Sequence, residues 1–192
     1  MRKVPLLLTL LRALLAPVVV VLAIWAPRPW AFGLCLSLAF LTDIFDGMLA
    51  RRLRVATPGL RRLDSIADSL FYAGATFAVW RLQPAAITSR IGPLALLAFL
   101  ELARYLFDFA KFGREASYHM WSSKAWGIAL FAGFLSLLAL GTDNAAVDAA
   151  VWIGIISDIE GFAISVMLAQ WRNDIPTFIH ALRMRAQAQS VP

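Results

Sequence analysis

The chain has 192 residues, 60% of them hydrophobic, and its mean hydropathy is +0.71. A soluble domain of this length is far more polar, so the composition excludes one and indicates a protein that crosses a membrane several times. The formal net charge is +6, but the basic residues gather at the ends of apolar runs rather than on one polar face, so no nucleic-acid partner is expected.

Six apolar runs follow one another along the chain, each close to the roughly 20 residues that a helix needs to cross about 30 Å of hydrocarbon. The first run is too long for the apolar part of a secretory signal and contains Arg12, so we expect it to be retained as a helix. No linker between the runs is long enough for a second domain, so residues 1–192 are expected to form a single membrane domain. We therefore expect an all-α integral membrane protein with six transmembrane helices at residues 5–26, 30–50, 63–82, 91–110, 125–141 and 146–170.

The basic residues orient these spans. With six spans both termini share a side, and thirteen Lys and Arg residues fall on that side, against Arg28, Arg81 and Arg90 on the other. The positive-inside rule assigns the more basic side to the cytoplasm, so we expect a protein of the cell (inner) membrane with both termini cytoplasmic. The tail at residues 173–189 mixes apolar and basic residues. It is expected either to lie on the inner membrane surface as an amphipathic helix or to end in disorder.

Four aspartates stand where the second predicted helix ends and the third begins: Asp43, Asp46, Asp64 and Asp68. A charged side chain deep in a bilayer costs roughly 2.5–3.5 kcal/mol on insertion scales, so four of them need a compensating partner. Their offsets of three and four residues place each pair on one helical face, and Gly47 and Ala67 are small enough for two helices to approach closely. Oxygen-only ligands favour a hard cation such as Mg²⁺, Mn²⁺ or Ca²⁺ over zinc.

A cluster of ion pairs is the structural alternative to a metal site. The neighbouring arginines available for it are Arg51, Arg52, Arg61 and Arg62. Such pairing would balance the charge, but it would explain neither the regular spacing of the aspartates nor the small residues between them.

The stretch from Asp43 to Asp68 resembles the signature of the CDP-alcohol phosphatidyltransferase family, D-x2-D-G-x2-A-R-x8-G-x3-D-x3-D. The matching residues are the four aspartates, Gly47, Ala50 and Arg51. One position departs, because the family's second glycine falls at Leu60, whereas this chain has Gly59. Upstream, Thr9-x-x-Arg12 resembles the family's N-terminal T-x-x-R, with Leu6 in place of the asparagine often seen before it.

This resemblance implies the transfer of a phosphatidyl or related phosphoalcohol group from a CDP-linked donor to an alcohol, with release of CMP, in phospholipid biosynthesis. CDP-diacylglycerol is the expected donor, because a buried site beside membrane lipids suits a lipid-tailed substrate. A small alcohol or phosphorylated polyol is the expected acceptor; glycerol 3-phosphate, inositol phosphate, inositol, serine and another phospholipid all stay open. The family precedent also implies a homodimer.

The resemblance also implies roles for individual residues at the cytoplasmic ends of the second and third helices. Two divalent ions, Mg²⁺ or Mn²⁺, would be held by Asp43, Asp46, Asp64 and Asp68. Asp68 would also be the catalytic base that accepts the proton of the acceptor hydroxyl. The residues expected to bind the CDP group are Gly47, Ala50, Arg51 and, with the loop shifted by one residue, Gly59.

The loop between the fourth and fifth predicted helices carries further basic residues. Arg114 and Lys124 are candidate acceptor-binding residues, and Lys124 at the membrane mouth favours a phosphorylated acceptor. The alternative interpretation is a solvated loop that only follows the positive-inside rule.

Several charged residues inside the spans need partners. Arg104 is expected either to pair with Asp158 or Glu160 or to contribute to an acceptor pocket or dimer interface, and Arg12 either reaches the membrane surface or lines the site. Two other function classes also stay open. A catalytically inactive scaffold of the same family would fit the departure at Leu60. A cation transporter would need acidic residues at the midplane of several helices.

Overall fold

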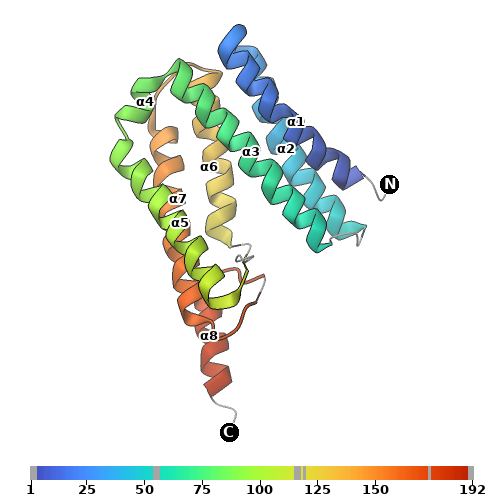
Figure 1. The fold of residues 1–192 in the computed structure, drawn as a ribbon, viewed down its shortest axis with the longest axis vertical. Helices are drawn as coiled ribbons and strands as arrows, with labels where there is room; N and C mark the ends of the chain where they lie inside the picture. Colours follow the sequence, from blue (N-terminus) through green and yellow to red (C-terminus); the bar gives the residue numbers. More distant parts are fainter. Residues whose placement is uncertain (1–3, 54–56, 115–117, 119, 173, 190–192) are drawn as a thin grey trace. The chain divides into compact units, whose positions relative to one another are not determined.

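The structure is a computed structural model that describes residues 4–53, 57–114, 118, 120–172 and 174–189, without the side chains of residues 50, 51, 58, 61 and 186–189. The described residues form eight α-helices, which confirms the all-α expectation. In chain order (Figure 1) the helices are α1 (Val4–Trp25), α2 (Pro29–Arg52), α3 (Pro58–Leu82), α4 (Pro84–Thr88), α5 (Ile91–Phe112), α6 (Trp121–Leu138), α7 (Ala145–Met167) and α8 (Phe178–Gln189).

Among the described residues, α1, α2, α6 and α7 are long and apolar enough to cross a membrane. The helices α3 and α5 have 25 and 22 residues, but charged residues interrupt their apolar character. In α3 these are arginines and aspartates of the first three turns and Arg81 of the last, and in α5 they are Glu101, Arg104, Asp108 and Lys111. Four helices therefore support membrane insertion, and the two further spans stay a prediction.

The helix bounds lie within a few residues of the predicted runs, with three differences. Helix α3 begins at Pro58 instead of residue 63, because Thr57 caps it and a proline suits its first turn. Helix α6 begins at Trp121 instead of residue 125, because Ser122 and Ser123, too polar to extend the apolar run, form hydrogen bonds with side chains of α7. The predicted break between the third and fourth runs contains the short helix α4. It begins at Pro84, a residue suited to the first turn of a helix because that turn does not need its backbone N–H.

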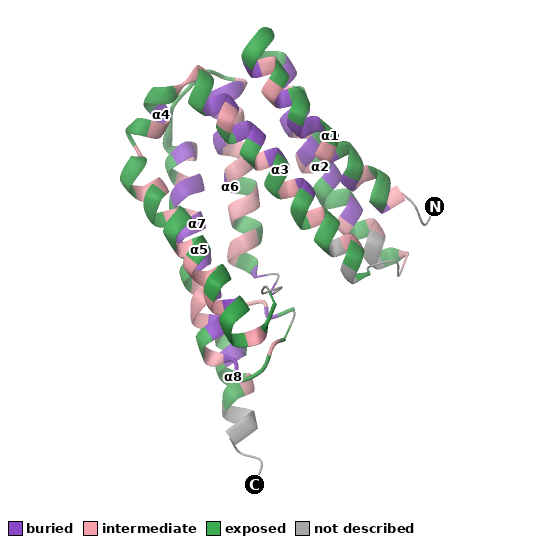
Figure 2. Cartoon of the chain, in the orientation of Figure 1, coloured by how far each residue is buried: buried purple, intermediate pink, exposed green. Residues whose placement is uncertain are grey.

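The chain forms two compact units. Unit 1 is Met1–Ser89 with Phe134–Asn144, and unit 2 is Arg90–Gly133 with Ala145–Pro192. In unit 1, α1 packs against both α2 and α3. Buried residues line the faces that these helices turn toward one another, and exposed residues cover the outer faces (Figure 2).

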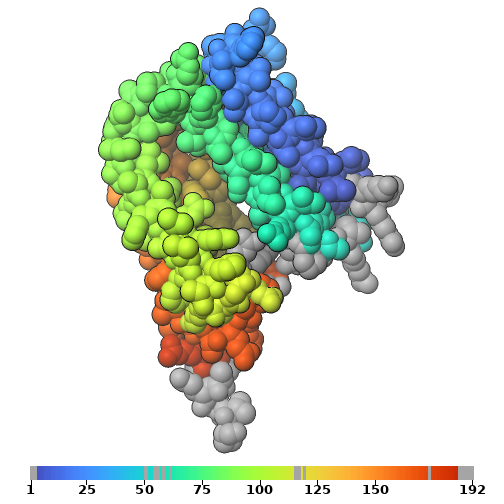
Figure 3. All heavy atoms as spheres, in the orientation of Figure 1, coloured from blue at the N-terminus to red at the C-terminus, as the bar shows by residue number. Residues whose placement is uncertain are grey.

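Small residues bring α1 and α3 together. A Cβ atom added at Gly74 of α3 would lie 3.0 Å from the backbone oxygen of Ala16 in α1, so the two backbones touch at this level. In the space-filling view the side chains of the two helices are in contact along their length (Figure 3).

The outer face of α1 is apolar as well, since Leu7, Leu14 and Val21 are 61%, 65% and 55% exposed. A helix that is hydrophobic all round suits a lipid environment.

In unit 2, α7 packs against α5 and α8. Its glycines admit larger neighbours, because Gly154 faces the indole ring of Trp126 and Gly161 faces Arg104 and Met120. An apolar cluster then closes the region where α8 begins. Its buried members are Tyr118, Met120, Ile164, Leu168, Ile175 and Ala181.

Candidate active site

The aspartates of α2 and α3 come together in unit 1 because both helices pack on α1. Asp43 and Asp46 lie one turn apart near the end of α2. The start of α3 is set by Thr57, whose hydroxyl accepts a hydrogen bond from the Leu60 backbone N–H at 3.2 Å. Because this cap fixes where the helix begins, Asp64 and Asp68 follow one turn apart on one face of α3.

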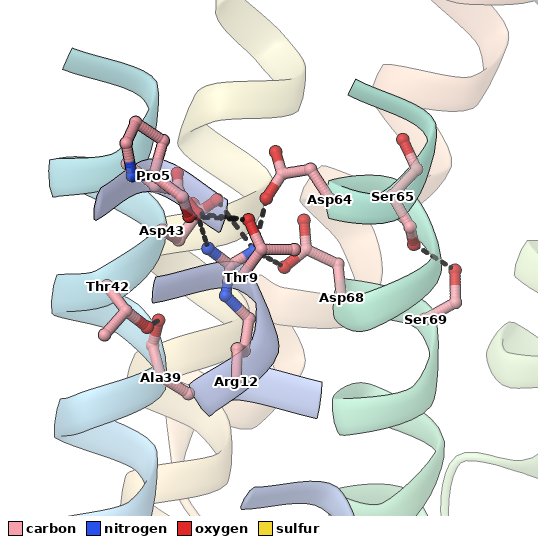
Figure 4. Close-up of polar contacts among 11 residues, drawn as sticks. Pro5, Thr9, Arg12, Ala39, Thr42, Asp43, Asp64, Ser65, Asp68 and Ser69 are labelled. Atoms are coloured by element: carbon pink, nitrogen blue, oxygen red, sulfur yellow. Dashed lines mark hydrogen bonds and ion pairs between the residues drawn. The ribbon is translucent and has the colours of Figure 1, made fainter. Parts of the chain in front are cut away.

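Arg12 of α1 projects into the middle of the aspartates (Figure 4). Its Nη2 atom lies 2.6 Å from Oδ2 of Asp46, and its Nη1 atom lies 3.0 Å from Asp64 and 3.2 Å from Asp43. The same Nη1 also donates a hydrogen bond to Oδ1 of Asp68. The Arg12 side chain is 2% exposed. Arg12 was expected either to reach the membrane surface or to line the site. In the structure it lines the site.

Thr9 lies one turn before Arg12 and faces the same cluster. Its hydroxyl is 3.3 Å from Oδ2 of Asp46 and 3.1 Å from the backbone oxygen of Pro5, so it can donate to either acceptor. Thr9 and Arg12 thus both bind Asp46, which is 4% exposed and the most buried of the four clustered aspartates. The spacing of the T-x-x-R pattern follows from this arrangement, because residues three apart share a helical face.

The donor set of the cluster fits a hard divalent cation. Asp43, Asp64 and Asp68 each offer a carboxylate oxygen, and these oxygens all lie within 4.8 Å of one another. Opposite ligands around Mg²⁺ or Mn²⁺ stand about 4 Å apart, and around Ca²⁺ about 5 Å, so the observed spacing needs little adjustment. Arg12 brings one positive charge to four carboxylates, which leaves negative charge for a cation to neutralise.

Polar residues within unit 2 form a second network. Of the two acidic partners expected for Arg104, the structure pairs it with Asp158, whose Oδ1 lies 3.1 Å from Nε of the arginine. Glu160 instead accepts hydrogen bonds from the Ser122 hydroxyl at 2.5 Å and from the Phe178 backbone N–H at 3.0 Å. Glu160 therefore joins the starts of α6 and α8 to α7.

A comparison with protein families decides the relationship of the chain. The model of the CDP-alcohol phosphatidyltransferase family matches residues 2–170. The chain belongs to this family. The matched range includes Thr9, Arg12 and the four aspartates, and it ends before α8 of unit 2.

Curated relatives carry one common name, CDP-diacylglycerol--glycerol-3-phosphate 3-phosphatidyltransferase. The protein of Pseudomonas fluorescens is 37% identical over 95 residues, which are 44% of this chain and 48% of the relative. The protein of Cereibacter sphaeroides is 44% identical over 69 residues, 34% of this chain and 31% of the relative. That of Salmonella choleraesuis is 41% identical over 75 residues, 37% and 40% of the two chains. The chain thus spans less than half the length of each of these relatives, and no solved structure matches it significantly.

The nucleotide-binding positions of the CDP-alcohol phosphatidyltransferase signature are only partly described. Gly47 is half-buried and directly follows Asp46 on α2. The backbones of Ala50 and Arg51 belong to the same helix, but their side chains lie outside the described residues. Gly59 is exposed in the first turn of α3, where an added Cβ atom would meet nothing within 4 Å. No close neighbour among the described residues therefore requires a glycine at that position.

The two candidate acceptor-binding residues both belong to unit 2, and each lies beside an aromatic ring. The Arg114 guanidinium carbon is 4.9 Å from the ring centre of Trp171, and the Lys124 Nζ atom is 4.3 Å from that of Trp121. These contacts orient the two cations at modest energetic gain, and acceptor binding by them stays a prediction.

Two polar contacts were missed in the sequence. The T-x-x-R pattern includes Thr9 but does not indicate that this residue contacts Asp46 directly. Lys111 follows the fourth predicted helix, where the sequence alone indicates only a basic residue at a membrane edge. Its Nζ atom instead donates to the backbone oxygens of Ser165 and Val166, 2.9 and 3.1 Å away, and thereby satisfies the last turn of α7.

Proposed function

We propose that the chain is a metal-dependent transferase that moves the phosphatidyl group of CDP-diacylglycerol to glycerol 3-phosphate and releases CMP, as a step of phospholipid biosynthesis. The observation that carries this proposal is the convergence of all four signature aspartates on Arg12. The names of the relatives support the choice of donor and acceptor. The basic residues near Lys124 are consistent with an acceptor that carries a phosphate.

In the proposed reaction an acceptor hydroxyl attacks the phosphorus atom that bears the diacylglycerol group. A new phosphorus–oxygen bond forms, the bond to the CMP oxygen breaks, and the hydroxyl proton goes to a carboxylate. Asp43, Asp46, Asp64 and Asp68 would hold Mg²⁺ or Mn²⁺, two ions by family precedent. When bound, such ions neutralise the negative charge of the diphosphate and of the departing CMP.

The exposures of the four carboxylates separate their proposed roles. Asp46 is 4% exposed and engaged by Thr9 and Arg12, so an acceptor hydroxyl cannot reach it easily. Asp68 is 34% exposed, and its position is therefore open to a substrate. Asp43 and Asp64 are exposed to a similar degree, 49% and 34%, so exposure supports Asp46 as a ligand with a fixed orientation and leaves Asp68 open to act as the base that the family signature implies.

The CDP group is proposed to lie over the end of α2 and the start of α3, against Gly47, Ala50, Arg51 and Gly59. A glycine permits close approach of the nucleotide, and an arginine at the end of α2 can form paired hydrogen bonds with phosphate oxygens. Arg114 and Lys124 remain the proposed contacts of the acceptor phosphate.

We further propose that residues 1–192 act as one membrane domain with six spans, the four apolar helices together with α3 and α5. Large apolar residues on the surface of α5, such as Phe99, Leu102 and Leu106, are 66%, 58% and 58% exposed, which suits contact with lipid or with a second subunit. The proposed assembly is a homodimer in the cell (inner) membrane. Both termini and the aspartate site face the cytoplasm, where CDP-linked substrates are made.

The test uses the purified full chain with labelled CDP-diacylglycerol and Mg²⁺ or Mn²⁺, and offers each candidate acceptor in turn. We expect CMP release and a phosphatidylglycerophosphate product with glycerol 3-phosphate, and no release in excess chelator. The Asp68→Asn variant is the matched control. A folded wild-type protein that binds the donor but turns over no acceptor would instead indicate an inactive scaffold.

A further inference from the structure

A cavity of about 570 Å³ lies within unit 2, where α7 ends and the chain turns toward α8. Its walls come from the last turn of α5, the last turn of α7 and the segment after it, and the middle of α8. Of the described residues that line it, three are cationic and none is acidic; the cationic ones are Lys111, Arg172 and Arg185. The cavity shares no residue with the aspartate site.

The cations keep hydrogen-bonding capacity for an anion. The Lys111 ammonium is held in place by two carbonyl oxygens at the end of α7, and it has a third N–H to donate. Arg185 contacts Met167 through one Nη atom, 3.3 Å from the sulfur, which is only a weak acceptor. Arg172 is exposed at the rim.

The same lysine removes an obstacle to anion binding. The carboxyl end of a helix carries partial negative charge, which would repel an anion near the end of α7. Because Lys111 binds the backbone oxygens of Ser165 and Val166, that end presents an ammonium group to the cavity in place of these two carbonyl groups.

Apart from Gln170, the rest of the lining is apolar and adaptable. Val166, Met167, Leu168 and Met184 supply it, and methionine side chains fill irregular spaces readily because they are unbranched. A cavity with cations and an apolar wall suits an amphiphile that joins an anionic group to hydrocarbon. Arginine guanidinium groups match the oxygens of a phosphate in pairs, which favours phosphate over a single carboxylate.

The exposed face of α8 argues that the ligand comes from the membrane. Ile179 and Leu182 are 58% and 40% exposed beside the basic residues Arg183 and Arg185, the pattern of a helix that lies in a membrane surface. We propose that this cavity binds the phosphate of an anionic membrane phospholipid and so holds α8 on the membrane surface. This site goes beyond the transfer reaction and does not depend on the identity of its substrates.

The experiment measures binding of phosphatidylglycerol to the purified full chain in detergent, with phosphatidylcholine as the zwitterionic comparison. Arg172→Gln and Arg185→Gln, singly and combined, remove cavity cations that are exposed enough for the fold to survive. Arg183→Gln is the matched control, because Arg183 is an exposed arginine of the same helix that does not line the cavity. Melting temperatures verify that every variant is folded.

We expect phosphatidylglycerol to bind more tightly than phosphatidylcholine. Each cavity substitution should weaken phosphatidylglycerol binding about fivefold, the change that corresponds to about 1 kcal/mol for each basic residue. Arg183→Gln should change it less than twofold. Equal losses in Arg183→Gln and the cavity variants would mean diffuse attraction to a charged surface and would overturn the site. If soluble glycerol 3-phosphate competes for the cavity as well as phosphatidylglycerol does, the proposal that the bound phosphate belongs to a lipid would be overturned.

Discussion

Replacing Arg12 by glutamine tests the electrostatic design of the aspartate site most directly. The substitution removes the guanidinium group that contacts four carboxylates and leaves Asp46, at 4% exposure, with the Thr9 hydroxyl as its described partner. Breaking a buried ion pair by removing one member costs about 3–5 kcal/mol. Asp43, Asp64 and Asp68 are between one third and one half exposed. Water therefore screens their ion pairs with Arg12, and these pairs add little to the cost of about 3–5 kcal/mol.

We therefore expect Arg12→Gln to lose about 3–5 kcal/mol of stability in the presence of a chelator. Divalent metal should reverse much of this loss, because a cation and the guanidinium group compete for the same carboxylate oxygens. The variant should thus bind Mn²⁺ more tightly than the wild type and gain more stability from it. Thermal melting of the purified protein with chelator or with Mn²⁺ measures the stability, and electron paramagnetic resonance of free Mn²⁺ measures the affinity.

Two control variants separate this effect from a general loss of charge. Arg28→Gln removes an exposed arginine between α1 and α2, and it should change neither stability nor Mn²⁺ affinity. Arg12→Lys keeps the charge but loses the forked geometry, so it should fall between the wild type and Arg12→Gln. The reasoning fails if Arg12→Gln melts like the wild type in chelator, or if Mn²⁺ stabilises it no more than the wild type.

Three further predictions concern catalysis and packing. Asp68→Asn should abolish CMP release while donor binding largely survives, whereas Asp43→Ala should weaken metal and donor binding; wild-type turnover in the first variant would exclude Asp68 as the base. If the acceptor carries a phosphate, Lys124→Ala should raise the acceptor KM about ten- to a hundredfold. A hydrogen bond to a charged group contributes about 1.5–3 kcal/mol, which corresponds to this change. An equal change in the donor KM would leave Lys124 without a specific role. Gly74→Leu should destabilise the protein by about 1–3 kcal/mol and reduce turnover, because a Cβ atom at position 74 would lie 3.0 Å from the Ala16 backbone oxygen. Unchanged melting and activity would show that α1 and α3 can separate freely.

The sequence predicts local features of this protein well. Apolar runs place the helices within a few residues, because hydrophobic length is a property of consecutive residues. The spacing of the aspartates likewise assigns each pair to one helical face. The all-α class and the family membership both follow from such local patterns.

Contacts between distant segments are less predictable. Whether Arg12 points to lipid or to α2 and α3 depends on the rotation of α1, and its partner Asp64 is 52 residues away. Lys111 satisfies the end of α7 across 54 residues, a contact that no local pattern contains. The choice of Asp158 over Glu160 as the partner of Arg104 similarly depends on how α5 and α7 pack.

The position of Arg12 also has a consequence for how the protein is made. An arginine near the centre of a transmembrane helix costs roughly 2.5–3.5 kcal/mol on insertion scales, and α1 is synthesised before any of the carboxylates that neutralise it. Asp43 and Asp46 arrive next, on α2, and already bring the arginine a buried partner. Insertion of α1 and α2 as a paired hairpin would therefore be easier than insertion of α1 alone. The residues that assemble the aspartate site would also guide the nascent chain into the bilayer.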